Sequence, residues 1–191
     1  MPGGGRASRE RLWLLRAREA VNLVNGSTLA GLGVAVAGRA RLARAPDRLF
    51  IGTGYRLPVP PAPAFCLGNV ILTRGDGIDS GSPLFAHEAR HATQFACCGG
   101  VAMVPMYLAA AGVSWVLTGD FGARNVFERR AGLADGGYTD RPLRPVFRRA
   151  ISRRAVSRRV SGSGLTAGRR SRLDPGRRAS ARDRSTASPS R

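Results

Sequence analysis

Apolar residues recur at helical spacing between Ser8 and Val24, and this pattern predicts a helix with Ser8 as its N-cap. The apolar stripe of this helix consists of Leu12, Leu15, Ala20 and Leu23. Asn25-Gly26 ends the helix, and a second, almost wholly apolar helix is expected over residues 29–37.

Two shorter apolar runs predict strands, at residues 49–53 and 65–73, the second of which ends at a turn over 74–77. Between them, the proline-rich residues 58–63 are expected to be extended and cannot occupy a central position in a sheet. With the helices, these strands predict an α+β fold that is mostly helical and contains a small antiparallel sheet.

Two more helices are expected downstream of the strands. Ser80 or Ser82 can cap the first, with Pro83 in its first turn. The second is expected over residues 125–135, with Asn125 as N-cap and Gly136 as the residue that stops it.

Residues 95–119, between these two helices, contain no charged side chain. The run is long enough to cross a bilayer, which takes about 20 residues. However, Gly99-Gly100 and Pro105 interrupt it. A membrane span, a wholly buried helix and a helix half-sunk in a membrane surface therefore stay open as interpretations.

Charge is concentrated at the C-terminal end of the chain. Residues 1–140 hold 15 Arg against 10 Asp and Glu, whereas residues 141–191 hold 16 Arg against 2 Asp. This shift predicts a domain over 8–142 and a largely disordered Arg/Ser-rich tail over 143–191. Paired arginines without interleaved aromatics favour, at most, non-specific binding of polyanions by the tail.

Three cysteines, Cys66, Cys97 and Cys98, do not make a disulfide framework, and buried free thiols are expected. The N-terminus lacks the pattern of a signal peptide. Together these features predict a cytoplasmic location and leave peripheral membrane association open.

The two histidines of the chain form the motif His87-Glu88-Ala89-Arg90-His91, which is HExxH. Residues four apart share one helix face, so both imidazoles can bind one metal ion, for which this motif predicts zinc. Glu88 lies beside them and is expected to act as general base on a metal-activated water molecule rather than as a ligand.

A catalytic zinc site needs a third protein ligand, and Glu128 is the favoured candidate. The other two glutamates, Glu10 and Glu19, lie among arginines in the first helix. A competing interpretation makes Asn125 and Glu128 a capping box, in which the carboxylate accepts from the Asn125 backbone. Asp135 is the reserve ligand or a partner for an imidazole, and Cys97 and Cys98 are more distant alternatives.

The motif His87-Glu88-x-x-His91-x-x-Gln94, followed by the uncharged run and then Asn125-x-Phe-Glu128-x-x-Ala131, resembles small gluzincin-type zinc metallopeptidases of uncharacterised families common in actinobacteria. The resemblance covers about residues 20–142. It implies a minimal zincin-like domain with His87, His91 and Glu128 as metal ligands and Glu88 as the catalytic glutamate. Many gluzincins have an acidic residue four positions after the ligand glutamate, where this chain has Gly132.

The expected function is therefore hydrolysis of peptide bonds in a peptide or protein substrate. In such zinc proteases the strand before the metal helix lies at the sheet edge and pairs with extended substrate, which suits residues 65–73. Gln94 can bond a ligand or the substrate, or be a polar residue on an exposed turn, and Tyr138 is a candidate donor to the oxyanion. The alternative is a catalytically inactive scaffold, associated with a membrane surface or with nucleic acid.

Overall fold

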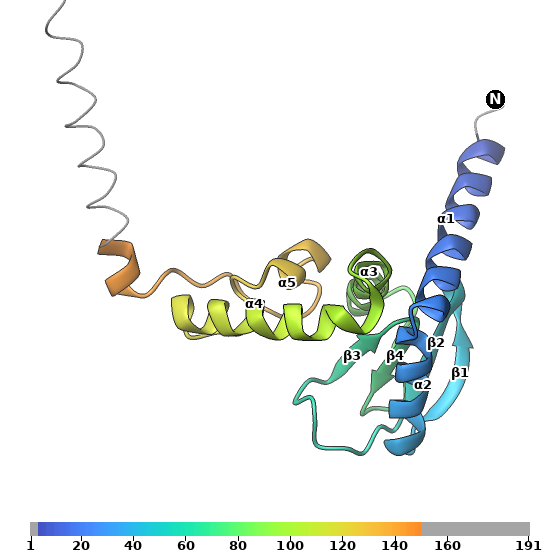
Figure 1. The fold of residues 1–191 in the computed structure, drawn as a ribbon, viewed down its shortest axis with the longest axis horizontal. Helices are drawn as coiled ribbons and strands as arrows, with labels where there is room; N and C mark the ends of the chain where they lie inside the picture. The colour runs from blue at the N-terminus through green and yellow to red at the C-terminus, as the bar shows by residue number, and fades with distance from the viewer. Residues whose placement is uncertain (1–3, 150–191) are drawn as a thin grey trace, which may run out of the picture. The chain divides into compact units, whose positions relative to one another are not determined.

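The computed structural model describes residues 4–149 and shows a mixed α/β architecture (Figure 1). The labelled helices are α1 (Gly4–Val24), α2 (Ser27–Ala37), α3 (Pro83–Cys97), α4 (Met103–Thr118) and α5 (Val126–Ala131), and residues 145–149 are also helical. The strands are β1 (Arg41–Ala45), β2 (Leu49–Thr53), β3 (Ala64–Leu67) and β4 (Val70–Thr73). Short 3-10 turns, η1 (Pro46–Arg48) and η2 (Gly100–Ala102), precede β2 and α4. The predicted disorder of the tail falls on residues that are mostly outside this range.

The strands form one four-stranded sheet in the order β1-β2-β4-β3. The outer pairs are antiparallel, but β2 and β4 are parallel, so the expectation of a purely antiparallel sheet is wrong. The expected strand over 65–73 is also wrong, because it is a tight hairpin of β3 and β4. Gly68, at a φ of 62°, permits this turn. The hairpin reverses the chain and thereby sets β4 parallel to β2.

The sheet has an apolar cluster on each face, because α3 covers one face and α2 the other (Figure 1). The cluster under α3 contains Leu49, Cys66, Ile71, Phe85 and Ala92. The cluster under α2 contains Ala35, Tyr55, Val70 and Leu72. Strand β4, one of the two central strands, is buried along its whole length and packs against both helices.

A buried network of amide side chains ties α3 to the N-terminal helices. The Asn22 side chain donates to the backbone oxygen of Ala92 in α3 (2.8 Å) and to Asn69 Oδ1 (2.9 Å). Asn69 in turn donates to Thr28 Oγ1 (2.9 Å). Buried amides are tolerated only when they are hydrogen-bonded, and these bonds fix the position of α3 against the sheet.

The uncharged run forms the end of α3, the turn η2 and α4, and it is not a wholly buried helix. Only Met103, Ala111 and Ser114 of α4 are buried. By length and composition, Gly100–Thr118 is one helix of the described part that is apolar enough to cross a membrane. The pair α1 and α2, bent by 71°, meets the same test only when both are taken together.

Candidate metal centre

Helix α3 presents both histidines and Glu88 on its buried side. Ser82 caps this helix by accepting from the Phe85 backbone N–H (3.2 Å), and Pro83 follows in the first turn, as expected. The rings of His87 and His91 are 4.6 Å apart between centroids, and their Nε2 atoms are 3.0 Å apart. The spacing of four residues therefore brings two ring nitrogens to one point.

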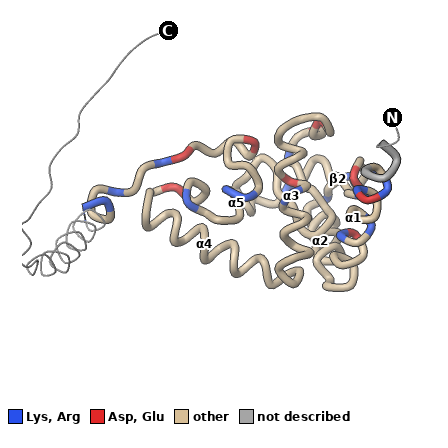
Figure 2. Tube along the Cα trace, turned by 90° about the horizontal axis from the view of Figure 1, so that it is seen from above, with Lys and Arg blue, Asp and Glu red and all other residues tan. Residues whose placement is uncertain are grey.

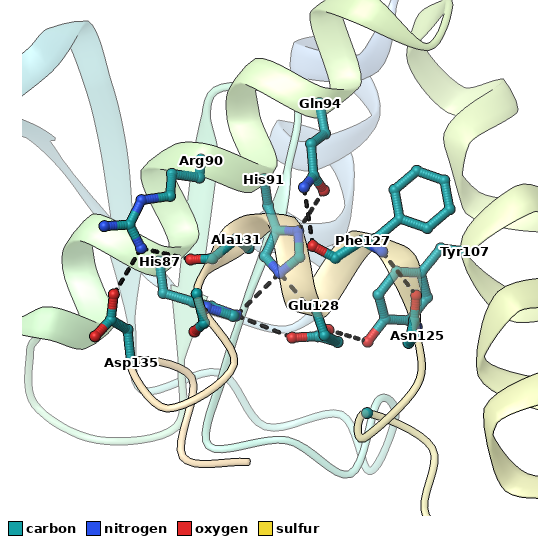
Figure 3. Close-up of polar contacts among 12 residues, drawn as sticks. His87, Arg90, His91, Gln94, Tyr107, Asn125, Phe127, Glu128, Ala131 and Asp135 are labelled. Atoms are coloured by element: carbon teal, nitrogen blue, oxygen red, sulfur yellow. Dashed lines mark hydrogen bonds and ion pairs between the residues drawn. The ribbon is translucent and has the colours of Figure 1, made fainter. Parts of the chain in front are cut away.

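Helix α5 brings Glu128 to the same point (Figure 3). Glu128 Oε2 lies 3.1 Å from His87 Nε2, and Oε1 lies 3.6 Å from His91 Nε2. One ligand atom from each of the three residues lies within 4.8 Å of the others, and all three side chains are buried. The structure thus brings together the three residues that the sequence selected as ligands.

The competing capping box is not formed. Asn125 caps α5 through its side chain, which accepts from the Phe127 backbone N–H (3.0 Å). The Asn125 backbone N–H donates to the Gly122 oxygen (2.9 Å) and not to Glu128. The Glu128 carboxylate is therefore free to face the histidines.

Hydrogen bonds at the far side of each ring fix which nitrogen carries the proton. His87 Nδ1 lies 3.0 Å from the Gly132 carbonyl oxygen, which can only accept. Gln94 donates its amide nitrogen to the Phe127 oxygen (2.9 Å), and its own oxygen lies 2.8 Å from His91 Nδ1. Nδ1 is thus assigned as the donor in both rings, which leaves Nε2 of each ring facing the other ring and Glu128, where it can bind a metal ion or a proton.

His87 Nε2, His91 Nε2 and the Glu128 carboxylate converge in a buried space away from water. Because all three atoms can accept, they need a shared cation or a proton between them. Burial disfavours the charged form of His87, but Glu128 outweighs burial and the pKa of His87 is raised. Burial also raises the pKa of Glu128, yet hydrogen bonds from His87, His91 and Tyr107 lower it to about 2. Among the described residues, this is the only group of histidine, cysteine and acidic side chains that could hold a metal ion.

Tyr107 of α4 belongs to the site and was missed from the sequence. Its hydroxyl donates to Glu128 Oε1. Burial, followed by the charge of Glu128, raises the pKa of Tyr107, so the hydroxyl remains a donor. The available signal was a tyrosine within an uncharged helix, because such a hydroxyl needs a hydrogen-bonding partner when it is buried.

The alternative ligands lie elsewhere. Asp135 forms an ion pair with Arg90 (2.7 Å). It is not a partner of an imidazole, because His87 Nδ1 is bonded to the Gly132 oxygen and His91 Nδ1 to the Gln94 side chain. Cys97 is exposed and Cys98 half-buried, so the expectation of buried thiols holds only for Cys66.

The glycines after Ala131 shape the wall of the site. Helix α5 ends at Gly132, at a φ of 92°, and not at Gly136, so the expected helix over 125–135 is too long. The left-handed conformation of Gly132 turns the chain where its carbonyl meets His87. A Cβ atom at Gly136 would lie 2.6 Å from His87 Nε2, so only glycine permits this close approach.

Glu88 is buried beside His87, His91 and Glu128, but it is not one of the three residues whose ligand atoms converge. Its Oε2 atom has no hydrogen-bonding partner. Burial raises the pKa of Glu88 to about 6. Glu88 also lines a cavity of about 280 Å³, whose other lining residues include His91, Glu128 and Tyr138. A carboxylate in this position is suited to proton transfer near neutral pH.

The rest of the cavity wall is mostly apolar and comes from β3, the preceding loop and α4. It includes Pro60, Ala62, Phe65, Leu67, Met103, Val104 and Leu108. Strand β3 lies at one edge of the sheet, and among residues 4–149 it pairs only with β4. The cavity therefore joins a free strand edge to the buried polar group.

No family model, curated protein or solved structure matches this chain.

Replacing Gln94 with leucine is expected to lower the affinity of the site for a divalent metal ion by about 10- to 100-fold, the usual effect of losing a partner of a metal-binding histidine. Leucine removes the acceptor for His91 Nδ1 and the donor to Phe127 at similar volume. Competition with a chromophoric chelator measures the affinity. Gln94→Glu restores the acceptor and is the matched control. An unchanged affinity in Gln94→Leu would show that this hydrogen bond does not orient a ligand.

Proposed function

We propose that this protein is a zinc-dependent metallopeptidase in which His87, His91 and Glu128 hold the ion. The observation that carries the proposal is the buried Glu88 carboxylate, which stands beside three converging ligand atoms and has an unpartnered oxygen. A structural metal site has no need for such a group, whereas a hydrolytic site requires it.

The donor set favours zinc over harder cations. Two imidazole nitrogens and one carboxylate match the three protein ligands of catalytic zinc sites, which keep a fourth position open. Magnesium and calcium prefer sites made of oxygen ligands. When bound, zinc would act as a Lewis acid on a carbonyl and lower the pKa of a water molecule to about 7.

Glu88 and Tyr138 are the residues of this chain that we assign to the chemistry. With a pKa of about 6, Glu88 is mostly ionised at neutral pH and can take a proton from water, then pass it to the leaving amine. Tyr138 lines the same cavity. Burial raises the pKa of Tyr138, so its hydroxyl stays protonated and can donate to the oxyanion.

The surroundings of the site favour a peptide substrate in an extended conformation. The unpaired edge of β3 offers backbone donors and acceptors to such a chain. The mostly apolar cavity beside Glu88 suits an apolar side chain of the substrate.

The test is an assay with the full chain carrying one equivalent of zinc and an unfolded protein such as reduced casein. We expect cleavage products in mass spectrometry, their loss with a chelator, and their return when zinc is added back. Stoichiometric zinc without any cleavage of unfolded proteins or peptide libraries would contradict the peptidase assignment and leave a metal-binding protein.

A further inference from the structure

Most of the surface of α4 is apolar and uncovered in the described part of the chain. Its buried stripe is narrow, and no charged residue occurs between Phe95 and Gly119. The exposed large apolar side chains on and around the helix are Val101, Met106, Leu108, Val113, Trp115, Val116 and Phe121, each at least 42% exposed. A surface of this kind is typical of a site that contacts a membrane or another protein.

Helix α2 extends this surface. No charged residue occurs over 20–38, and Leu29 and Val36 of α2 are exposed by 63% and 71%, beside Val24 at the end of α1, which is 90% exposed. The two helices approach each other through η2, where Gly100 packs against Asn25. In Figure 2, the lower side of the trace, where α2 and α4 run, shows no charged position. We call the exposed apolar side chains of α2, η2 and α4 the α2–α4 face.

Hydrogen bonds on the buried side of α4 limit the orientations that the helix can take relative to a bilayer. Tyr107 donates to Glu128, and Ser114 Oγ donates to the Asp120 oxygen (2.6 Å). Ser114 Oγ also accepts from the Arg124 backbone N–H (2.8 Å). A transmembrane α4 would carry these charged residues into hydrocarbon, which is strongly unfavourable. If α4 instead lies in the plane of the membrane interface, with its exposed apolar side chains toward the bilayer, all of these hydrogen bonds are preserved.

Side chains of the kinds that favour a membrane–water interface lie at the C-terminal end of α4. Trp115 stacks on Phe121, with centroids 6.2 Å apart and planes at 19°. The Arg144 guanidinium lies 5.2 Å from the centroid of the Trp115 ring and has no carboxylate partner among the described residues. Tryptophan favours the membrane–water interface, and arginine favours anionic lipid. Residues 1–147 also carry 17 Arg against 10 Asp and Glu, and this positive net charge favours binding to an anionic surface.

We propose that the α2–α4 face docks the protein on the surface of an anionic lipid bilayer, with α4 lying in the plane of the interface. This inference does not depend on the metal centre or on peptidase activity. It has one consequence for them: Val104 and Leu108 of α4 also line the cavity beside Glu88. Docking would hold the cavity next to the bilayer, where segments of membrane-associated proteins are accessible.

The test is co-sedimentation of the full chain with vesicles of phosphatidylcholine alone or with 30% phosphatidylglycerol, in 0.5 M NaCl. The high salt screens binding that is only electrostatic, including binding by the arginines beyond residue 147. We expect binding to the anionic vesicles, and we expect Val116→Asp and Val113→Asp each to weaken it by about tenfold or more. Val59→Asp is the matched control, because Val59 is equally apolar, 65% exposed and outside the α2–α4 face.

A spectroscopic readout locates the contact. In a Trp13→Phe protein, Trp115 is the only tryptophan, and its emission should shift to the blue and be quenched by brominated lipid. Absence of binding to both vesicle types would overturn the proposal, as would equal binding by Val116→Asp and the wild type. Dimerisation that Val116→Asp abolishes, without lipid binding, would overturn it and assign the face to a second copy. Zinc content is measured on every variant, so a damaged metal centre is distinguished from lost docking.

Discussion

Replacing Glu88 with glutamine is expected to lower kcat/KM for peptide hydrolysis by about 10²- to 10⁴-fold, the usual contribution of a general base. Zinc content should stay at one ion per chain, because Glu88 is not one of the three converging ligands. Glutamine keeps the size of the side chain but cannot accept the proton. The measurements are initial rates and metal analysis of the same preparation.

The same substitution has an expected effect on stability with a defined sign. The pKa of Glu88 is raised from 4.5 to about 6, so folding of the metal-free protein favours the protonated form. This contribution is fully present below about pH 4.5 and is lost as the pH rises through about 6. The ionised carboxylate therefore destabilises the fold at pH 7 by about 2 kcal/mol. Metal-free Glu88→Gln should melt at a higher temperature than the wild type at pH 7, but not at pH 4.

Glu10→Gln is the control, because Glu10 is an exposed glutamate on α1. It should leave the rate, zinc content and melting temperature unchanged. Full activity of Glu88→Gln would exclude Glu88 as the base. Joint loss of zinc and activity would show instead that Glu88 supports the metal centre.

Replacing Glu128 with glutamine is expected to lower zinc affinity by more than about 100-fold, the upper range for loss of an outer partner. The change removes the only carboxylate among the three converging side chains. It leaves two imidazoles, and these do not make a three-ligand site. Titration with zinc against a chelator of known affinity measures the effect. Glu10→Gln again serves as the control, and unchanged affinity would exclude Glu128 as a ligand.

Metal-free Glu128→Gln should also lose a characteristic pH dependence of stability. The lowered pKa of Glu128 stabilises the wild type above about pH 4.5, and this contribution is lost as the pH falls through about 2. The raised pKa of His87 stabilises it below about pH 6.5, and that contribution is lost as the pH rises through the folded-state pKa. The pairing therefore contributes most between about pH 4.5 and 6.5. A melting curve of Glu128→Gln that keeps the wild-type pH profile would contradict the pairing.

Local patterns located α1, α2 and α3, indicated where α5 begins, and selected the three residues that converge. His87 and His91 lie four apart, and helix geometry alone brings their rings together. The Asn125 cap followed from residue type and position, because capping is a bond to a near neighbour, and of the two candidates Ser80 and Ser82 the structure selects Ser82. Glu128 was selected by elimination, since a three-ligand site needs an acid or a thiol.

Only the tertiary structure decided what depends on contacts between distant segments. The parallel pairing of β2 with β4 follows from the hairpin at Gly68, and strand patterns do not encode which neighbours pair. The contacts of Tyr107, of Gln94 with Phe127 and of Gly132 with His87 join residues 21 to 45 positions apart. The role of Glu128 was likewise decided by the packing of α5 against α3. Its sequence position allowed either a capping box with Asn125 or a place beside the histidines, and the packing puts the carboxylate beside His87.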